Sequence, residues 1–224
     1  MVARVQTVAF QGIEAVPVDV QAQFTSGIPP GVVIVGLPDK AIKEAGERVK
    51  AALISSGLSL PPKRIVVNLA PADLPKEGSH YDLPIALALM AAIGAFPADA
   101  LDGYVALGEL GLDGRLAPVG GVLPAALAAH GRDLGIICPA PSGPEAAWAG
   151  DDLEIVAPDS LLALVNHLGG YQLCTRPVPR RHDPAAGLPD LSEVRGQEVA
   201  RRALELAAAG GHNLLRLCQL LSLA

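Results

Sequence analysis

The chain has 224 residues, of which 50% are hydrophobic but only 3% aromatic, and its net charge at pH 7 is −6. This length suits one medium-sized domain plus a smaller unit, and a core of Ala, Val, Leu and Ile favours the close helix-on-sheet packing of α/β layers. The negative charge argues against a protein whose whole surface binds nucleic acid, although a local basic patch remains compatible with it.

The first half of the chain combines alternating strands with periodic helices. Alternating apolar residues on either side of Gln11-Gly12 predict a β-hairpin, and the short apolar run Gly31–Gly36 predicts a buried strand. Asp39 is placed to cap the following helix. This helix has one buried stripe on a spacing of three to four residues, formed by Ile42, Ala45, Val49, Ala52 and Leu53. The expected elements are strands at 2–10, 13–24 and 31–36, a helix at 39–56, a strand at 63–69 and a helix at 83–94.

The second half of this unit alternates strand and helix, which implies parallel pairing with right-handed crossovers. Leu112-Asp113-Gly114 is a strong turn signal, so Tyr104–Leu110 and Arg115–Val119 are expected to form another hairpin. The remaining expected elements are a helix at 120–130, a strand at 135–138, a short helix at 144–149, a strand at 153–156 and a helix at 160–168.

A change of composition predicts two units joined by a linker. Tyr171–Asp190 is proline-rich, charged and aperiodic, as linkers are. We therefore expect a domain over residues 1–170, a linker over 171–190 and a second unit over 191–224. In the second unit Glu198–Ala209 predicts a helix, and Asn213-Leu214-Leu215 is expected to begin a buried strand.

The apolar segments and the cysteines indicate a cytoplasmic protein. The most apolar stretch, Leu83–Phe96, is shorter than the ~18 to 20 residues that span a bilayer. The N-terminus alternates in polarity and does not form the apolar core of a signal peptide. Cys138, Cys174 and Cys218 are odd in number and lack the paired spacing of a zinc site. We expect reduced thiols, no metal site and no membrane segment.

Most chemically active side chains gather in the loop between the strand at 63–69 and the helix at 83–94. This loop carries Lys76, Glu77, Ser79, His80, Tyr81 and Asp82. A helix N-terminus offers backbone donors and the positive end of the helix dipole. The loop is therefore a candidate anion or catalytic site, or else a polar loop in which Asp82 simply caps the helix.

Several motifs carry a resemblance to known families. Pro75–Asp82 and Gly108–Gly121 resemble two segments of Lon-type proteases, the second lying just before the Lon catalytic lysine. The closest resemblance is to the YifB/ComM family of magnesium-chelatase-like AAA+ ATPases, over residues 1 to about 215. Its marks are Val35–Pro38, Val67–Asp73, Lys76–Gly78 and Tyr81–Ala86. The resemblance implies an α/β (α+β) fold of the Lon proteolytic-domain type, related to ribosomal protein S5 domain 2.

The Lon resemblance also implies that the peptidase chemistry has been lost. A Ser–Lys dyad needs a serine hydroxyl within hydrogen-bonding distance of a lysine of lowered pKa. The matching register places His80 at the serine position and Leu123 at the lysine position, with Ser79 one place early, and no lysine follows Lys76. We expect a non-catalytic scaffold. The alternative is a degenerate or residual Ser-dependent peptidase in which His80 serves Ser79 as a base.

The second unit resembles the beginning of an AAA+ module, through Pro189–Gln197 and Ala200–Leu215. The resemblance implies that Val194, Gly196 and Gln197 lie beside the adenine of ATP. The family then continues into a Gly-rich phosphate-binding loop, which works with Mg²⁺. The residues after Leu215 contain neither glycine nor lysine. We therefore expect a frameshifted or truncated reading frame, and no productive binding of ATP or Mg²⁺ by this chain alone.

A basic cluster is the candidate DNA contact, and its members are Lys40, Lys43, Arg48, Lys50, Lys63 and Arg64. Glu44 and Glu47 are spaced to pair with the lysines, so a solvated helix face is the alternative explanation. The family resemblance implies hexameric, ATP-driven DNA helicases that act in branch migration during transformation. Weakly bound DNA and further copies of the chain are thus the expected partners. A chelatase-type metal-insertion subunit is a third possibility and would also need the ATPase core.

Overall fold

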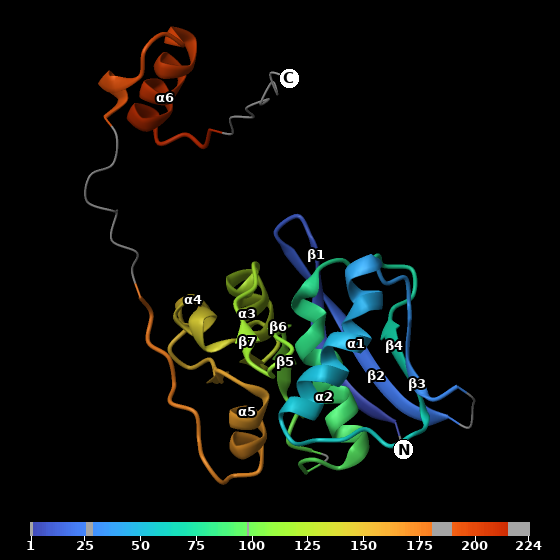
Figure 1. Cartoon of the computed structure of the whole chain (residues 1–224). Coiled ribbons are helices and arrows are strands. Elements are labelled where there is room, and N and C mark those ends of the chain that lie inside the picture. The colour runs from blue at the N-terminus through green and yellow to red at the C-terminus, as the bar shows by residue number, and fades with distance from the viewer. Residues whose placement is uncertain (1, 26–28, 98, 181–189, 215–224) are drawn as a thin grey trace. The chain divides into compact units, whose positions relative to one another are not determined.

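The computed structural model describes residues 2–25, 29–97, 99–180 and 190–214 (Figure 1). It divides into two compact units, Met1–Arg180 and Arg181–Ala224. The first unit thus extends ten residues beyond the end expected from the sequence. Cys174 donates its backbone N–H to His167 Nδ1 at 3.0 Å, and the Arg176 guanidinium donates to the Gly150 carbonyl at 3.2 Å. These contacts hold the segment after residue 170 against the first unit.

A seven-stranded sheet forms the centre of the first unit, in the order β3-β4-β2-β1-β5-β8-β9. All its strands run in one direction except β2, which is antiparallel to both of its neighbours. The expected α/β class is therefore confirmed. The strands are β1 Ala3–Gln11, β2 Glu14–Thr25, β3 Gly31–Val35, β4 Arg64–Ala70, β5 Tyr104–Ala106, β8 Gly135–Ile137 and β9 Ile155–Val156.

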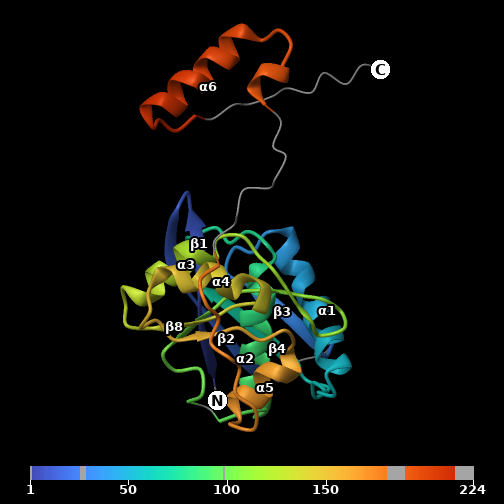
Figure 2. The ribbon, with the colours of Figure 1, turned by 90° about the vertical axis from the view of Figure 1, so that its left-hand side faces the viewer.

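Helices cover both faces of this sheet (Figures 1 and 2). Helices α1 (Lys40–Ser55), α2 (Asp82–Ile93) and α5 (Leu161–Leu168) pack on one face, while α3 (Val122–His130) and α4 (Gly143–Ala146) pack on the other. Because side chains alternate along a strand, β1 contributes to two cores. Val5 and Ala9 join the core under α1 and α2, and Val8 joins the core under α3 and α4.

The predictions for the two long helices are confirmed. All five residues of the expected α1 stripe are fully buried. Asp39 caps α1, because its Oδ1 accepts the Ile42 N–H at 2.8 Å. Helix α2 is apolar all round and is buried continuously from Asp82 to Met90. It lies in the middle of its layer, against both α1 and the sheet.

Two strand predictions were wrong in their details. β3 is an edge strand, not a buried one, and the side chains of Val33 and Val35 are 36% and 41% exposed. The expected hairpin is shorter, because Tyr104–Ala106 joins the main sheet as β5. Only β6 (Glu109–Leu110) and β7 (Leu116–Ala117) form the hairpin. The chain leaves the main sheet at Gly108, whose N–H is donated to the His80 carbonyl instead of a strand.

The second unit contains a turn at Leu191–Glu193 and helix α6 (Glu198–Gly210), which confirms the helix expected there. Asn213 and Leu214 have no regular structure, and the rest of the strand expected from Leu215 lies outside the described residues, as does Cys218. In the first unit Cys138 and Cys174 are free thiols. No helix within the described ranges is both long enough and apolar enough to cross a bilayer.

Candidate functional site

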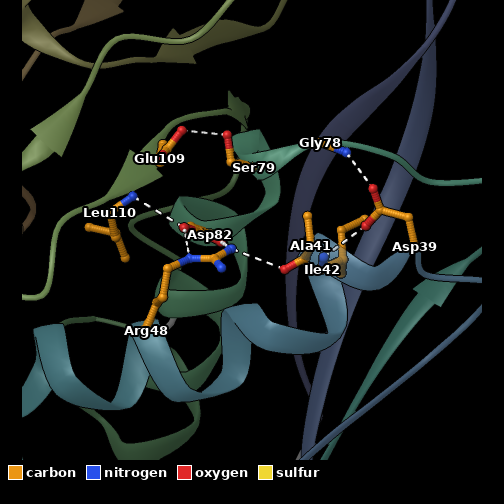
Figure 3. Close-up of polar contacts among 9 residues, drawn as sticks. All are labelled: Asp39, Ala41, Ile42, Arg48, Gly78, Ser79, Asp82, Glu109 and Leu110. Atoms are coloured by element: carbon orange, nitrogen blue, oxygen red, sulfur yellow. Dashed lines mark hydrogen bonds and ion pairs between the residues drawn. The ribbon is translucent and has the colours of Figure 1, made fainter.

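The candidate loop is held against the segment that follows β3, at the ends of two adjacent parallel strands. Pro38 and Lys76 form an isolated β-bridge, in which the Asp39 N–H donates to the Lys76 carbonyl at 3.0 Å. Asp39 also accepts the Gly78 N–H at 3.1 Å through Oδ2, while its Oδ1 caps α1 (Figure 3). One carboxylate therefore ties the start of α1 to the candidate loop.

Asp82 forms the best-connected polar contact of the site (Figure 3). Its fully buried carboxylate accepts two hydrogen bonds from Arg48, at 2.9 and 3.0 Å, and one from the Leu110 N–H at 3.3 Å. Burial raises the pKa of Asp82, while the Arg48 hydrogen bonds oppose that rise. Asp82 is therefore not the side-chain cap that one interpretation of the sequence predicts. Its carboxylate joins α2 to α1 instead.

Ser79 and His80 form hydrogen bonds to different partners. The Ser79 hydroxyl donates to the Glu109 carboxylate (Figure 3). His80 Nε2 lies 3.0 Å from the Val8 carbonyl, which can only accept, so this nitrogen carries the ring proton. Burial lowers the pKa of His80 and favours the neutral ring. The geometry therefore does not pair the two as nucleophile and base.

Lys76 is also committed to a structural contact. Its side chain is fully buried and its Nζ donates to the Pro71 carbonyl. Burial lowers the pKa of Lys76, and the negative charge of Asp73 opposes that effect. The buried ammonium group fixes the turn after β4, so it is not directed at the Ser79 hydroxyl, which bonds Glu109.

The position at which the resemblance places the Lon lysine lies on the first turn of α3. Leu123 is half-buried there, and its backbone N–H donates to Glu145 Oε1 at 3.1 Å. Phe10 lies between this turn and the candidate loop. Its ring is 5.3 Å from the His80 ring, and a Cβ on Gly121 would come within 2.5 Å of it. The Phe10 ring therefore lies between His80 and Leu123, the two positions that match the Lon Ser–Lys dyad.

The six residues of the expected basic cluster do not form one patch. Arg48 points inward to Asp82 and to the Ala41 carbonyl, and only 26% of its side chain is exposed. Lys40 lies 3.8 Å from Glu44, and Lys43 and Lys50 are exposed on the same helix. Lys63 is exposed just before β4. Arg64 lies on the opposite face of the sheet from α1, because its neighbour Ile65 belongs to the core beneath that helix.

The expected adenine-side residues lie together in the second unit, just before α6. Val194 is 38% exposed, and Gly196 and Gln197 both have left-handed backbone, with φ of 68° and 52°. The shallow pocket on this unit is lined by α6 residues and by none of these three. Residues 190–214 contain no lysine. Among the described residues, no group of three or more His, Cys, Asp or Glu side chains is arranged to hold a metal ion.

Sequence reasoning missed two contributors to the site, Phe10 and Glu109. Glu109 lies in the motif Gly108–Gly121, which served only to align the chain with the Lon segment, so the sequence assigned no role to this carboxylate. The one sequence feature that could have indicated it is a single charged residue between apolar residues at the end of a short strand. Phe10 had no comparable signal, because its contact with His80 joins residues 70 positions apart.

Comparisons with known proteins agree on one family. Residues 20–142 match the family described as subunit ChlI of Mg-chelatase, and residues 190–219 match the family described as magnesium chelatase, subunit ChlI. The chain is similar to the uncharacterized protein YifB of Escherichia coli strain K12, with 44% identity over 94% of the chain and 41% of that protein.

Two further relatives are similar at the same level. They are the competence protein ComM of Haemophilus influenzae, with 41% identity over 92% of this chain and 41% of that protein, and the uncharacterized protein Rv2897c of Mycobacterium tuberculosis, with 41% identity over 95% of this chain and 42% of that protein. The chain thus spans about two fifths of the length of the curated relatives that it matches.

Proposed function

Because the chain belongs to the magnesium-chelatase ChlI family, in the group that includes YifB and ComM, we propose that it forms the N-terminal, non-peptidase part of an ATP-dependent DNA-remodelling protein. In this proposal its role is to contact DNA in the cytoplasm and to support assembly into a hexamer. ATP hydrolysis belongs to the remaining length of such proteins, since this chain spans about 41% of its relatives.

The observation that carries this proposal is the candidate loop. The three side chains of this loop that could serve as a nucleophile or a base are each engaged in a contact that stabilises the fold. Ser79 bonds Glu109, His80 bonds Val8, and Lys76 bonds Pro71. A loop in which the candidate nucleophile and bases are engaged in internal contacts supports a scaffold better than a catalytic site. Among the described residues of the loop, the buried Tyr81 hydroxyl has no hydrogen-bond partner. The word "competence" in the name of the Haemophilus relative supports a role that involves DNA.

The first test is DNA binding by the full 224-residue chain. We expect weak binding of a fluorescein-labelled oligonucleotide, followed by fluorescence anisotropy, and a steep dependence on salt. With about three phosphate contacts the affinity should fall roughly tenfold or more between 50 and 200 mM salt. No change in anisotropy at 50 mM salt would remove the proposed DNA contact.

The second test addresses the peptidase alternative. A serine-reactive fluorophosphonate should label the chain no more than it labels the Ser79→Ala variant, because no described base lies within hydrogen-bonding distance of the hydroxyl except the Glu109 carboxylate. Labelling is read by in-gel fluorescence, with a known serine hydrolase as the positive control. Labelling that disappears in Ser79→Ala would support a residual peptidase and contradict the non-catalytic role.

A further inference from the structure

Part of the central sheet has a face that no described helix covers. Residues Ile65, Val67 and Leu69 of β4 point into the core beneath α1 and α2, so Arg64, Val66 and Asn68 point to the other side. On that side α3 packs against β5, β8 and the hairpin end of β2. We call the remaining surface over β1, β2, β4 and β3 the open sheet face. Its polar members are Arg4, Gln6, Asp19, Gln21, Gln23, Thr25, Arg64 and Asn68.

The strand register places these side chains in rows. Gln21 lies between Arg4 on β1 and Asn68 on β4, and the next row joins Gln23, Val66 and Val33. The Asn68 amide donates to Gln21 Oε1 at 3.4 Å. Three neighbour spacings of about 4.8 Å separate β1 from β3, so the face is about 14 Å wide. It is polar along its centre and apolar at the exposed edge formed by β3, and Gln6, Asp19 and Arg132 line a pocket at its border.

The charge of this face is opposite in sign to that of the chain. Arg4 and Arg64 are set against a single acid, Asp19, whereas the whole chain carries a net charge of −6. Arg132 adds a third guanidinium at the border, where it donates to Gln6 Oε1 at 2.7 Å. Within the described ranges no carboxylate pairs with Arg4 or Arg64. Unpaired guanidinium groups over polar amides are complementary to a phosphate backbone.

The Gln and Asn side chains of the open sheet face favour binding of a single nucleic-acid strand over a duplex. Gln and Asn side chains both donate and accept, so they match the edges of bases. In a duplex those edges lie at the floor of grooves about 8 Å deep and at most about 12 Å wide, which a sheet face about 14 Å wide cannot enter. The edges of an unpaired strand are accessible to such a surface. The open sheet face has no aromatic side chain among its described residues, so base stacking contributes little and the contact is mainly electrostatic.

We propose that the open sheet face binds one unpaired DNA strand, with Arg4 and Arg64 on its phosphates and the amides of Gln21, Gln23 and Asn68 on its base edges. This inference rests on the proposed DNA-binding role and assigns that role to a surface. It replaces the α1 cluster as the main contact, because on α1 Arg48 is engaged and the lysines alternate with Glu44 and Glu47.

The test compares variants of the full chain in their binding of fluorescein-labelled dT20. Arg4→Gln/Arg64→Gln should weaken binding about tenfold at 50 mM salt and lower the slope of log K against log salt by about 1.4, since each lost contact with a single strand removes about 0.7. Arg4→Lys/Arg64→Lys keeps the charge and should recover most of the affinity. The matched control is Arg115→Gln/Arg202→Gln, which removes the same charge from exposed arginines paired with Asp113 and Glu205. Circular dichroism confirms that each variant is folded.

The outcomes separate this inference from the proposed function. If the wild type binds but the control weakens binding as much as Arg4→Gln/Arg64→Gln does, the face is not the contact. If Lys40→Gln/Lys43→Gln loses more affinity for dT20 than Arg4→Gln/Arg64→Gln does, the main contact lies on α1, which would also overturn the inference. Equal affinity for a duplex of the same length, or equally effective competition by polyglutamate, would overturn the single-strand assignment. Absence of any binding by the wild type would contradict the proposed DNA role itself.

Discussion

The Arg48→Met variant should lose about 3–5 kcal/mol of the free energy of unfolding at pH 7, because it leaves a carboxylate buried without its partner. Asp82 is fully buried, and two of its three hydrogen bonds come from Arg48. Urea denaturation followed by circular dichroism measures this loss. For a domain whose total stability lies between 5 and 15 kcal/mol, a loss of this size is a large share.

The loss should shrink as the pH falls. Burial raises the pKa of Asp82 and the Arg48 hydrogen bonds oppose the rise, so removing Arg48 raises that pKa further. A carboxyl whose pKa in the folded state exceeds its unfolded value of about 3.9 takes up its proton first in the folded state. The free energy of unfolding of the variant therefore increases as the pH falls through the pKa that Asp82 has in the folded state. The difference from wild type should be smaller at pH 5 than at pH 7.

Two control variants make this result specific to the ion pair. Arg48→Met/Asp82→Leu removes both charges and should recover most of the loss, because no buried charge is left unpaired. Lys50→Met removes an exposed charge from the same helix and should change stability by no more than about 0.5 kcal/mol. An Arg48→Met loss as small as that of Lys50→Met, or a double variant no better than the single one, would contradict a stabilising role for this pair.

Local periodicity predicted the helices of the first unit, because the spacing of three to four residues that marks a helix can be seen between residues close together in the sequence. The α1 stripe from Ile42 to Leu53 and the all-apolar α2 both follow from spacing alone. The sequence could not place β3 at the edge of the sheet. An apolar run such as Gly31–Gly36 indicates a strand, but strand order depends on pairing between residues that are far apart along the chain.

The sequence predicted which polar residues gather in the candidate loop, but it did not predict the hydrogen bonds that they form. The loop is the place where polar residues gather, as expected, yet the partners of Ser79, His80 and Asp82 are 30 to 72 residues away. Sequence spacing could not show that Ser79 bonds Glu109 or that His80 bonds Val8. One signal was available and went unused. Strand alternation around Ile65 already separates Arg64 from the basic residues of the preceding helix.

Gly36 offers the second large effect, because its backbone leaves no room for a side chain. Its φ is 104°, and an added Cβ would lie 2.1 Å from the Leu69 carbonyl oxygen of β4. Gly36→Ala should therefore cost about 3–5 kcal/mol, which combines backbone strain of about 1–2 kcal/mol with forced separation of packed backbone. The chain after Gly36 pairs with Lys76, so the variant should also loosen the candidate loop.

Gly57→Ala separates the two causes of that loss. Gly57 also has positive φ, at 79°, but nothing lies within 4 Å of an added Cβ. Backbone strain alone should then cost about 1–2 kcal/mol in this variant. Chemical denaturation gives both values, and amide hydrogen exchange should show lost protection in β3 and β4 for Gly36→Ala only. Equal losses in the two variants would mean that Gly36 is required for its φ and not for close approach to β4. If the larger loss is found, the close contact between Gly36 and Leu69 fixes the edge strand that borders the open sheet face, and single-strand binding should weaken together with it.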